Sequence, residues 1–234
     1  MGCLMVFRLK VCRAVAVVSI TLVMTACQGV DRSIHQDKTE LAKIRTAMAG
    51  QYIVAGRLDD AKRQLDMALA ADEGFAPAYD MMGVLLQSEG SDTNLVRADG
   101  YFRQALKLDN DLMRAHNNYA VYLIQIGHYD RAIHHFKIAS SNLGYEGRVQ
   151  SLENLAAAYQ RMGQYDDAIS AYHRAIDSGS ATERSYLQLI DLHVMHSNMN
   201  DARSVYQRAV ATFGRSSVLS DKGTQLQMPD LPKN

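Results

Sequence analysis

The stretch AHNNYAVYLIQIGHYDRAIHHFKIA, residues 115–139, predicts one helix, a turn and a second helix packed back on the first. Tyr119, Leu123 and Ile126 fall at i, i+4 and i+7, which places them on one helical face. Gly127 follows at the point where the chain must reverse, a position that often takes a positive φ. After it the same spacing recurs in Ala132, Phe136 and Ala139. Because one such hairpin cannot bury its apolar face alone, we expect the chain to repeat it.

The same hairpin does recur along the sequence. Paired alanines seven residues apart mark the second helix of each copy: Ala61/Ala68, Ala98/Ala105, Ala132/Ala139, Ala168/Ala175 and Ala202/Ala209. Successive pairs are 37, 34, 36 and 34 residues apart. The turn residues are Gly56, Gly90, Gly127, Gly163 and, in the fifth copy, Ser197. A 34-residue helix–turn–helix unit with fixed small and large positions is the tetratricopeptide pattern. The sequence therefore predicts an all-α, right-handed superhelical tetratricopeptide-repeat solenoid of about five repeats.

Two of the steps are longer than 34 residues, and the extra residues can be located. We expect SDTNLVR, residues 91–97, to widen the turn inside the second copy. We expect SSNLGYEGR, residues 140–148, to lengthen the connection between the third and fourth copies. Insertions in a solenoid map to loops and leave the stacking intact.

The N-terminal segment has the composition of an export signal. Residues 1–13 carry three basic residues and no acid, and residues 14–26 form an apolar run, too short for a transmembrane helix. The sequence Met-Thr-Ala-Cys that ends at Cys27 resembles the bacterial lipobox, which implies cleavage before Cys27 and lipid attachment to it. An ordinary signal with a chance cysteine and a retained helical anchor are the alternatives. Gln28 stands where Asp would resemble an inner-membrane retention signal, so we expect the outer membrane, with the protein facing the periplasm.

These segments divide the chain into four parts. We expect a lipoprotein signal peptide at 1–26, a polar tether at 27–38, the repeat domain at 39–216 and a C-terminal tail at 217–234. The repeats are expected at about 42–75, 76–112, 113–146, 149–182 and 183–216.

The composition of residues 27–234, the part that remains after the expected cleavage, limits the kinds of partner that the protein can bind. All three cysteines lie at or before Cys27, so the repeat domain must fold without disulfides. Residues 27–234 carry 22 Lys+Arg against 25 Asp+Glu, because residues 1–26 remove three bases and no acid. That balance argues against nucleic acid as a partner.

The sequence offers no convincing catalytic or metal site. His134 and His135 are adjacent and point about 100° apart on a helix, so they cannot share an ion. His193 and His196 are at i, i+3, but no further ligand completes a set, and His193 occupies a core position. We therefore expect no enzyme activity, no metal, no cofactor and no small-molecule substrate. Asn118 and Asn154 are equivalent and are expected to bond backbone across the hairpin junction.

The first helices of a stack line a concave surface that can bind protein segments. The inward residues are expected to be Ile53, Val54, Asp80, Val84, Gln87, Asn117, Val121, Ile124, Glu153, Ala157, Gln160, Leu187, Asp191 and Val194. The protein-binding groove is assigned to Val84, Asn117, Val121, Ile124, Ala157, Gln160 and Val194. This lining is mostly apolar and amide, and it lacks the paired Lys/Arg and Asn of a carboxylate clamp, so it favours an amphipathic strand or helix. Alternatively, some of the valines only pack on the neighbouring helix.

Two stretches of sequence reduce the number of repeat-protein families that fit this chain: NNYAVYLIQIGHYDRAIHHF (117–136) and GYEGRVQSLENLAAAY (144–159). With the lipobox and the repeats, they resemble the PilF/PilW family of type IV pilus biogenesis lipoproteins, or pilotins. The likeness covers about residues 24–215, and the enlarged turn of the second copy departs from it. The resemblance implies a non-enzymatic protein that binds the outer-membrane secretin subunit and promotes its localisation and multimerisation. The competing class is a repeat lipoprotein that organises peptidoglycan enzymes or another envelope complex.

Overall fold

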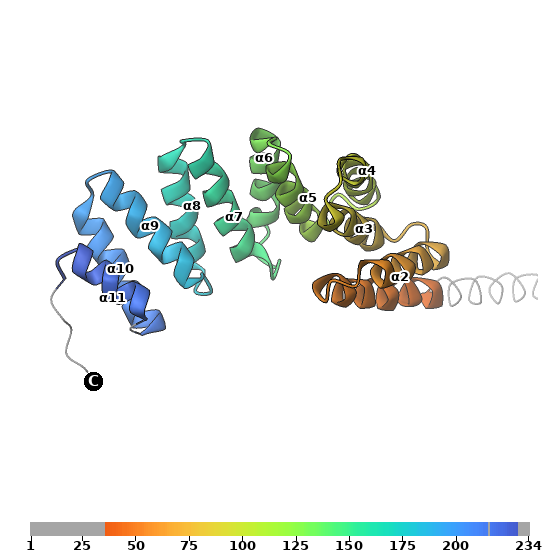
Figure 1. Cartoon of the computed structure of the whole chain (residues 1–234), viewed down its shortest axis with the longest axis horizontal. Helices are drawn as coiled ribbons and strands as arrows, with labels where there is room; N and C mark the ends of the chain where they lie inside the picture. The colour runs from red at the N-terminus through yellow and green to blue at the C-terminus, as the bar shows by residue number, and fades with distance from the viewer. Residues whose placement is uncertain (1–35, 215, 229–234) are drawn as a thin grey trace, which may run out of the picture.

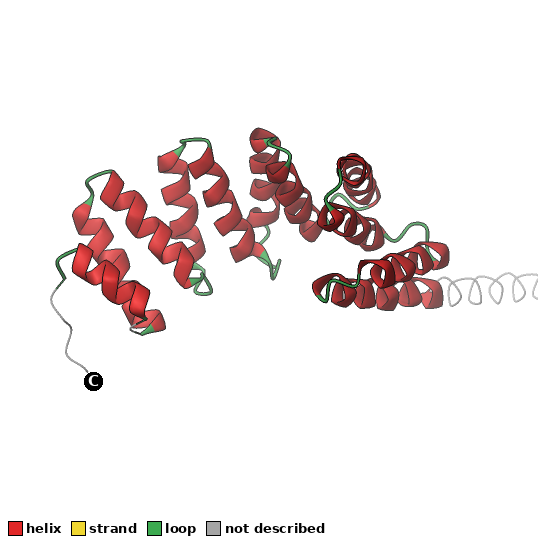
Figure 2. Ribbon diagram, in the orientation of Figure 1, coloured by secondary structure: helices red, strands yellow, loops and turns green. Residues whose placement is uncertain are grey.

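The computed structural model describes residues 36–214 and 216–228 as a row of helices (Figures 1 and 2). A helix over residues 36–54 comes first. It is followed by α2 (Leu58–Ala71), α3 (Ala76–Glu89), α4 (Asp92–Leu108), α5 (Met113–Gln125), α6 (Tyr129–Ser141), α7 (Arg148–Arg161), α8 (Tyr165–Asp177), α9 (Glu183–Met195), α10 (Met199–Phe213) and α11 (Ser217–Gln225). No strand occurs within the described ranges. The expected signal peptide and Cys27 lie outside them.

Consecutive helices pair into hairpins that stack along the long axis of the molecule, with the N-terminal and C-terminal hairpins at opposite ends (Figure 1). Every alanine of the repeating pairs is 0% exposed, which lets the helix backbones approach closely. A bulky side chain lies between the two alanines of each pair, Leu65 in the first copy and an aromatic residue in the other four. At Gly83 of α3, an added Cβ would lie only 2.8 Å from the ring of Phe102. The predicted tetratricopeptide solenoid is confirmed.

Each of the five turns contains one residue with positive φ. Gly56, Gly90, Gly127 and Gly163 have φ between 71° and 80°, as the turn prediction requires. Ser197 of the fifth copy takes φ 61° at the same place, although it carries a side chain. The turn geometry therefore holds even where glycine is missing.

The insertion in the second copy does not widen the turn, and that prediction is wrong. Only Gly90 and Ser91 separate α3 from α4, and the extra residues extend α4 to 17 residues. Ser91 explains this, because its hydroxyl accepts a hydrogen bond from the Asn94 amide and caps the helix before the insertion ends. The second insertion does lie between α6 and α7.

The C-terminal segment also differs from the expected tail. Residues 217–225 form α11, which packs against α10. Ser216 caps this helix through the Leu219 amide, and Leu219 and Leu226 are fully buried. The short helix thus covers the end of the last hairpin. None of the helices within the described ranges is both long and apolar enough to cross a membrane.

Candidate protein-binding surface

Polar residues at one repeat position join the second, third and fourth hairpins each to the one that follows. Asp80, Asn117 and Glu153 are equivalent residues of α3, α5 and α7. Asp80 accepts from Arg114 Nε at 3.0 Å and from Asn118 Nδ2 at 3.1 Å, both on the following hairpin. We name this set of cross-hairpin bonds the junction ladder.

The ladder continues in the next two hairpins. Asn117 Oδ1 accepts from Ser151 Oγ at 3.0 Å and from Asn154 Nδ2 at 3.4 Å. Glu153 Oε1 accepts from the Thr182 amide at 2.8 Å and from Ser185 Oγ at 2.7 Å.

The ladder corrects three sequence-based assignments. Asn117 was expected in the binding groove, but it is 6% exposed and its carbonyl oxygen is occupied by the next hairpin. Asp80, expected to point inward, is fully buried. Asn118 and Asn154 bond side chains across the junction and not backbone. A polar residue between two packed helices must find a partner there, and the neighbouring first helix supplies it.

The junction ladder buries the carboxylate of Asp80, which is electrostatically unfavourable. Burial raises the pKa of its carboxyl, and the charge of Arg114 and the hydrogen bond from Asn118 oppose that shift in part. Arg114 itself is 43% exposed in its side chain, so the ion pair joins a dry anion to a partly solvated cation.

Beyond the ladder, the first-helix surface contains two adjoining hollows. The smaller, which we call the apolar hollow, has a volume of about 130 Å³. It lies over α5 and α7, with Phe136 of α6 reaching it from between the two helices. Its lining residues are Val121, Ile124, Phe136, Asn154, Ala157, Ala158 and Arg161.

The larger hollow, which we call the arginine hollow, has a volume of about 510 Å³. It lies between α7 and α9, with Tyr172 of α8 beneath it. Its lining residues are Glu153, Asn154, Ala157, Gln160, Arg161, Tyr172, Thr182, Arg184, Ser185 and Gln188. Burial raises the pKa of the Tyr172 phenol to about 12, and its hydroxyl donates to Gln160 Oε1 at 2.8 Å.

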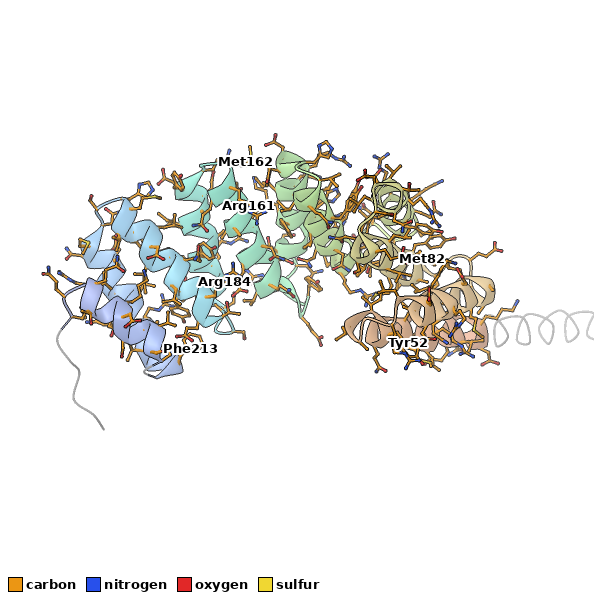
Figure 3. All side chains as sticks on the ribbon, viewed as in Figure 1. Tyr52, Met82, Arg161, Met162, Arg184 and Phe213 are labelled. Atoms are coloured by element: carbon orange, nitrogen blue, oxygen red, sulfur yellow. The ribbon has the colours of Figure 1, made fainter. Side chains whose placement is uncertain are left out.

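The two hollows share one wall, formed by Asn154, Ala157 and Arg161 of α7. Arg161 ends α7, whereas Arg184 lies in the first turn of α9 on the next hairpin (Figure 3). Neither guanidinium pairs with a carboxylate among the described residues. The surface therefore combines an apolar section with a cationic one.

The structure places four of the seven predicted groove residues in these hollows. Val121 and Ile124 line the apolar hollow, Gln160 lines the arginine hollow, and Ala157 lines both. Val84 and Val194 line neither and are partly buried against the core, which is the packing alternative considered for such valines.

The expectation that this groove lacks an arginine and asparagine set is wrong. Arg161, Arg184 and Asn154 line one hollow. Sequence spacing missed them because it follows one helix at a time, whereas the hollow combines side chains of neighbouring hairpins. Arg161 also lies at i+4 from the predicted Ala157, so the spacing along α7 was a usable signal.

Away from the two hollows, the ring of His116 of α5 lies beside that of His135 of α6, with the ring centroids 5.1 Å apart and the ring planes tilted by 33°. The Nδ1 atoms of His116 and His135 lie 2.8 Å apart, and His116 Nε2 donates to the Asn110 carbonyl at 3.0 Å. Burial lowers the pKa of both rings, that of His135 to about 4. Within the described ranges, no group of three or more His, Cys, Asp or Glu residues could hold a metal ion.

Comparison with known proteins agrees with this architecture. Residues 154–217 match the family model of the tetratricopeptide repeat. Over 198 residues the chain is 26% identical to the type IV pilus assembly protein PilF of Pseudomonas aeruginosa, covering 83% of this chain and 77% of that protein.

Solved structures give the same answer for the fold. The structure of Pseudomonas aeruginosa PilF superposes with a TM-score of 0.71 at 24% identity, over 81% of this chain and 84% of that one. The crystal structure of PilW, a widely conserved type IV pilus biogenesis factor, gives a TM-score of 0.62 at 17% identity, over 80% and 92%. The chain is thus similar in sequence to a type IV pilus assembly protein, and it shares the tetratricopeptide-repeat fold of PilF and PilW.

Proposed function

We propose that this chain is a non-enzymatic outer-membrane lipoprotein that binds the type IV pilus secretin and promotes its localisation and multimerisation. Its sequence similarity to a type IV pilus assembly protein supports the pilus assignment. The lipid on Cys27 would hold the solenoid at the inner leaflet of the outer membrane, where secretin subunits arrive.

The observation that carries the binding role is the pair of adjoining hollows on α5, α7 and α9. Val121 is 39% exposed although it is a large apolar residue, and Ile124 lies one turn further along α5. Exposed apolar side chains beside a concave surface are typical of a protein-binding site. The apolar hollow lies over the third and fourth of the five hairpins, near the middle of the stack, where a bound segment would be best shielded from water.

A non-enzymatic role fits the polar groups of this surface. The Glu153 carboxylate is tied to Thr182 and Ser185, and the Tyr172 hydroxyl is tied to Gln160. These groups hold hairpins together, and a nucleophile paired with a base is not among them. Their chemistry suits binding and alignment.

Deletion of the gene tests the proposal. Outer-membrane fractions should lose secretin multimers while secretin monomer remains detectable, and a plasmid copy should restore the multimers. Unchanged multimers in the deletion strain would refute the secretin role. Altered peptidoglycan cross-linking with normal multimers would support the competing scaffold role.

A further inference from the structure

We propose that the two hollows bind an extended segment of the partner that carries an acidic side chain next to an apolar one. The acidic side chain contacts Arg161, and the apolar side chain enters the apolar hollow. This inference rests on the proposed function for the identity of the partner, the secretin.

The first step is to establish which arginine side chains have a hydrogen-bond acceptor in the structure. Most arginine side chains in the described ranges donate to a carboxylate, an amide, a hydroxyl or a backbone carbonyl, as Arg57, Arg103, Arg148 and Arg208 do. Within those ranges the exceptions are Arg161, Arg174 and Arg184. Two of these three, Arg161 and Arg184, line the arginine hollow. An anionic group is the complement of such a site.

The second step is the difference between the two arginines. Arg184 shares its end of the hollow with the Glu153 carboxylate, which is fixed to the start of α9 by Thr182 and Ser185. That carboxylate offsets part of the charge of Arg184. Arg161 lies eight residues further along α7, about 12 Å from Glu153 at 1.5 Å per residue. Arg161 is therefore the stronger anion site.

The third step is the conformation of the bound segment. Asn154, Gln160 and Gln188 bring side-chain amides to the hollow. The Gln160 carbonyl oxygen accepts from Tyr172, and its amide nitrogen has no partner among the described residues. Amides recognise backbone N–H and C=O groups, which an extended segment offers and a helix has already used. The 12 Å between Glu153 and Arg161 matches about four extended residues at about 3.3 Å each.

The fourth step is the source of the carboxylate. Arg161 lines both hollows, so an anion bound to it lies in the middle of the path. The bound segment must continue on one side of this anion to place an apolar side chain near Val121 and Ile124. It must continue on the other side to fill the arginine hollow. A C-terminal carboxylate would end the chain there and leave one hollow empty. The geometry favours an internal Asp or Glu side chain.

The test uses the purified full chain and overlapping peptides covering the periplasmic sequence of the secretin. Binding peptides should carry an internal acid beside an apolar residue, and replacing that acid with its amide should weaken binding about tenfold or more. Arg161→Glu should weaken the same peptides as strongly, and Arg184→Glu less. Arg174→Glu is the matched control, because Arg174 is also exposed and unpaired but lines neither hollow, and it should bind as the native chain does.

The outcomes separate this inference from the proposed function. A Lys in place of the peptide's acid should restore binding to Arg161→Glu, which a misfolded variant could not do. Binding that needs a free C-terminus, or that is unaffected by Arg161→Glu, would overturn the inference and leave the secretin role standing. If no secretin peptide binds and gene deletion leaves secretin multimers intact, both fail.

Discussion

Asp80 of α3 and Arg114 of α5 form an ion pair of 3.0 Å across the junction between the second and third hairpins. The pair is unequal, because the Asp80 side chain is fully buried and the Arg114 side chain is 43% exposed. Asn118 supplies the only other donor to the carboxylate among the described residues. Arg114 and Asn118 therefore stabilise a buried carboxylate at a junction between hairpins, where most other contacts are apolar.

This inequality predicts that the two partners differ in their contribution to stability. Arg114→Met leaves a buried carboxylate without its cation and should lower the free energy of unfolding by about 3 kcal/mol at pH 7. Asp80→Asn removes the buried charge, keeps the shape and leaves the cation in contact with water, so it should cost less than about 1 kcal/mol. Urea unfolding of the two variants measures both. Equal losses, or the reverse order, would contradict this account of the junction.

Ser197 predicts a stabilising substitution. Its φ of 61° is a left-handed conformation that costs a side-chain-bearing residue about 1–2 kcal/mol, and glycine relieves that strain at an entropic cost of about 0.5–1 kcal/mol. Ser197→Gly should therefore raise the free energy of unfolding by about 0.5–1 kcal/mol. Gly127→Ser is the matched reverse change, since an added Cβ at Gly127 meets nothing within 4 Å, and it should lower stability by a similar amount. Thermal melts that move in the same direction for both variants would argue against backbone strain.

The histidines predict a loss of stability in mild acid. Burial lowers the pKa of His116, His135 and His193 in the folded chain. As pH falls below about 6.5, these imidazoles become protonated in the unfolded chain but stay neutral in the folded chain. The free energy of unfolding therefore falls until the pH reaches the pKa values of the folded chain. For His135 this window extends from pH 6.5 to about 4.

Two substitutions test that pH dependence. His135→Gln removes one titrating ring, and His193→Leu removes another whose two nitrogens have no hydrogen-bond partner within the described ranges. The double variant should lose less stability between pH 6.5 and 4, by more than about 1 kcal/mol. His193→Leu should also stabilise the chain at pH 7, because it removes buried unsatisfied polar atoms. An unchanged pH profile would show that other groups control the acid transition.

We predict that a lipid on Cys27 attaches the protein to the membrane. This prediction is based on the sequence alone, because Cys27 lies outside the described ranges. Stable anchoring needs two acyl chains or more, at about 0.8 kcal/mol per buried CH₂. Cys27→Ser should move the protein from the membrane fraction to the periplasm or stall it at the signal. Retention in the outer membrane after a high-salt wash would exclude the lipid as the anchor.

The sequence predicts this fold well because its small residues repeat. Ala132 and Ala168 are fully buried as their spacing requires, and Gly127 turns with φ 80°. It predicts the loops less well, because a local cap such as Ser91 can turn inserted residues into helix.

The surface is harder to predict, for a reason that Asn117 and Arg161 illustrate. Spacing along α5 places Asn117 on the side of the groove, but only the neighbouring α7 reveals that Ser151 and Asn154 bury it. Arg161 gains its role from α9, which begins after an intervening helix. Convergence between hairpins depends on how neighbouring helices pack, which the period of one helix does not contain.

The central claim is that the first-helix surface over α5 and α7 binds the secretin. The most direct measurement is co-purification of secretin with a Val121→Asp/Ile124→Asp variant from outer-membrane extracts. The variant should remain helical and membrane-bound but lose secretin, because binding would desolvate two carboxylates without partners. Val96→Asp/Leu143→Asp is the control, since both residues are exposed apolar side chains outside the hollows, and it should retain secretin. Normal co-purification of secretin with the folded Val121→Asp/Ile124→Asp variant would contradict the account.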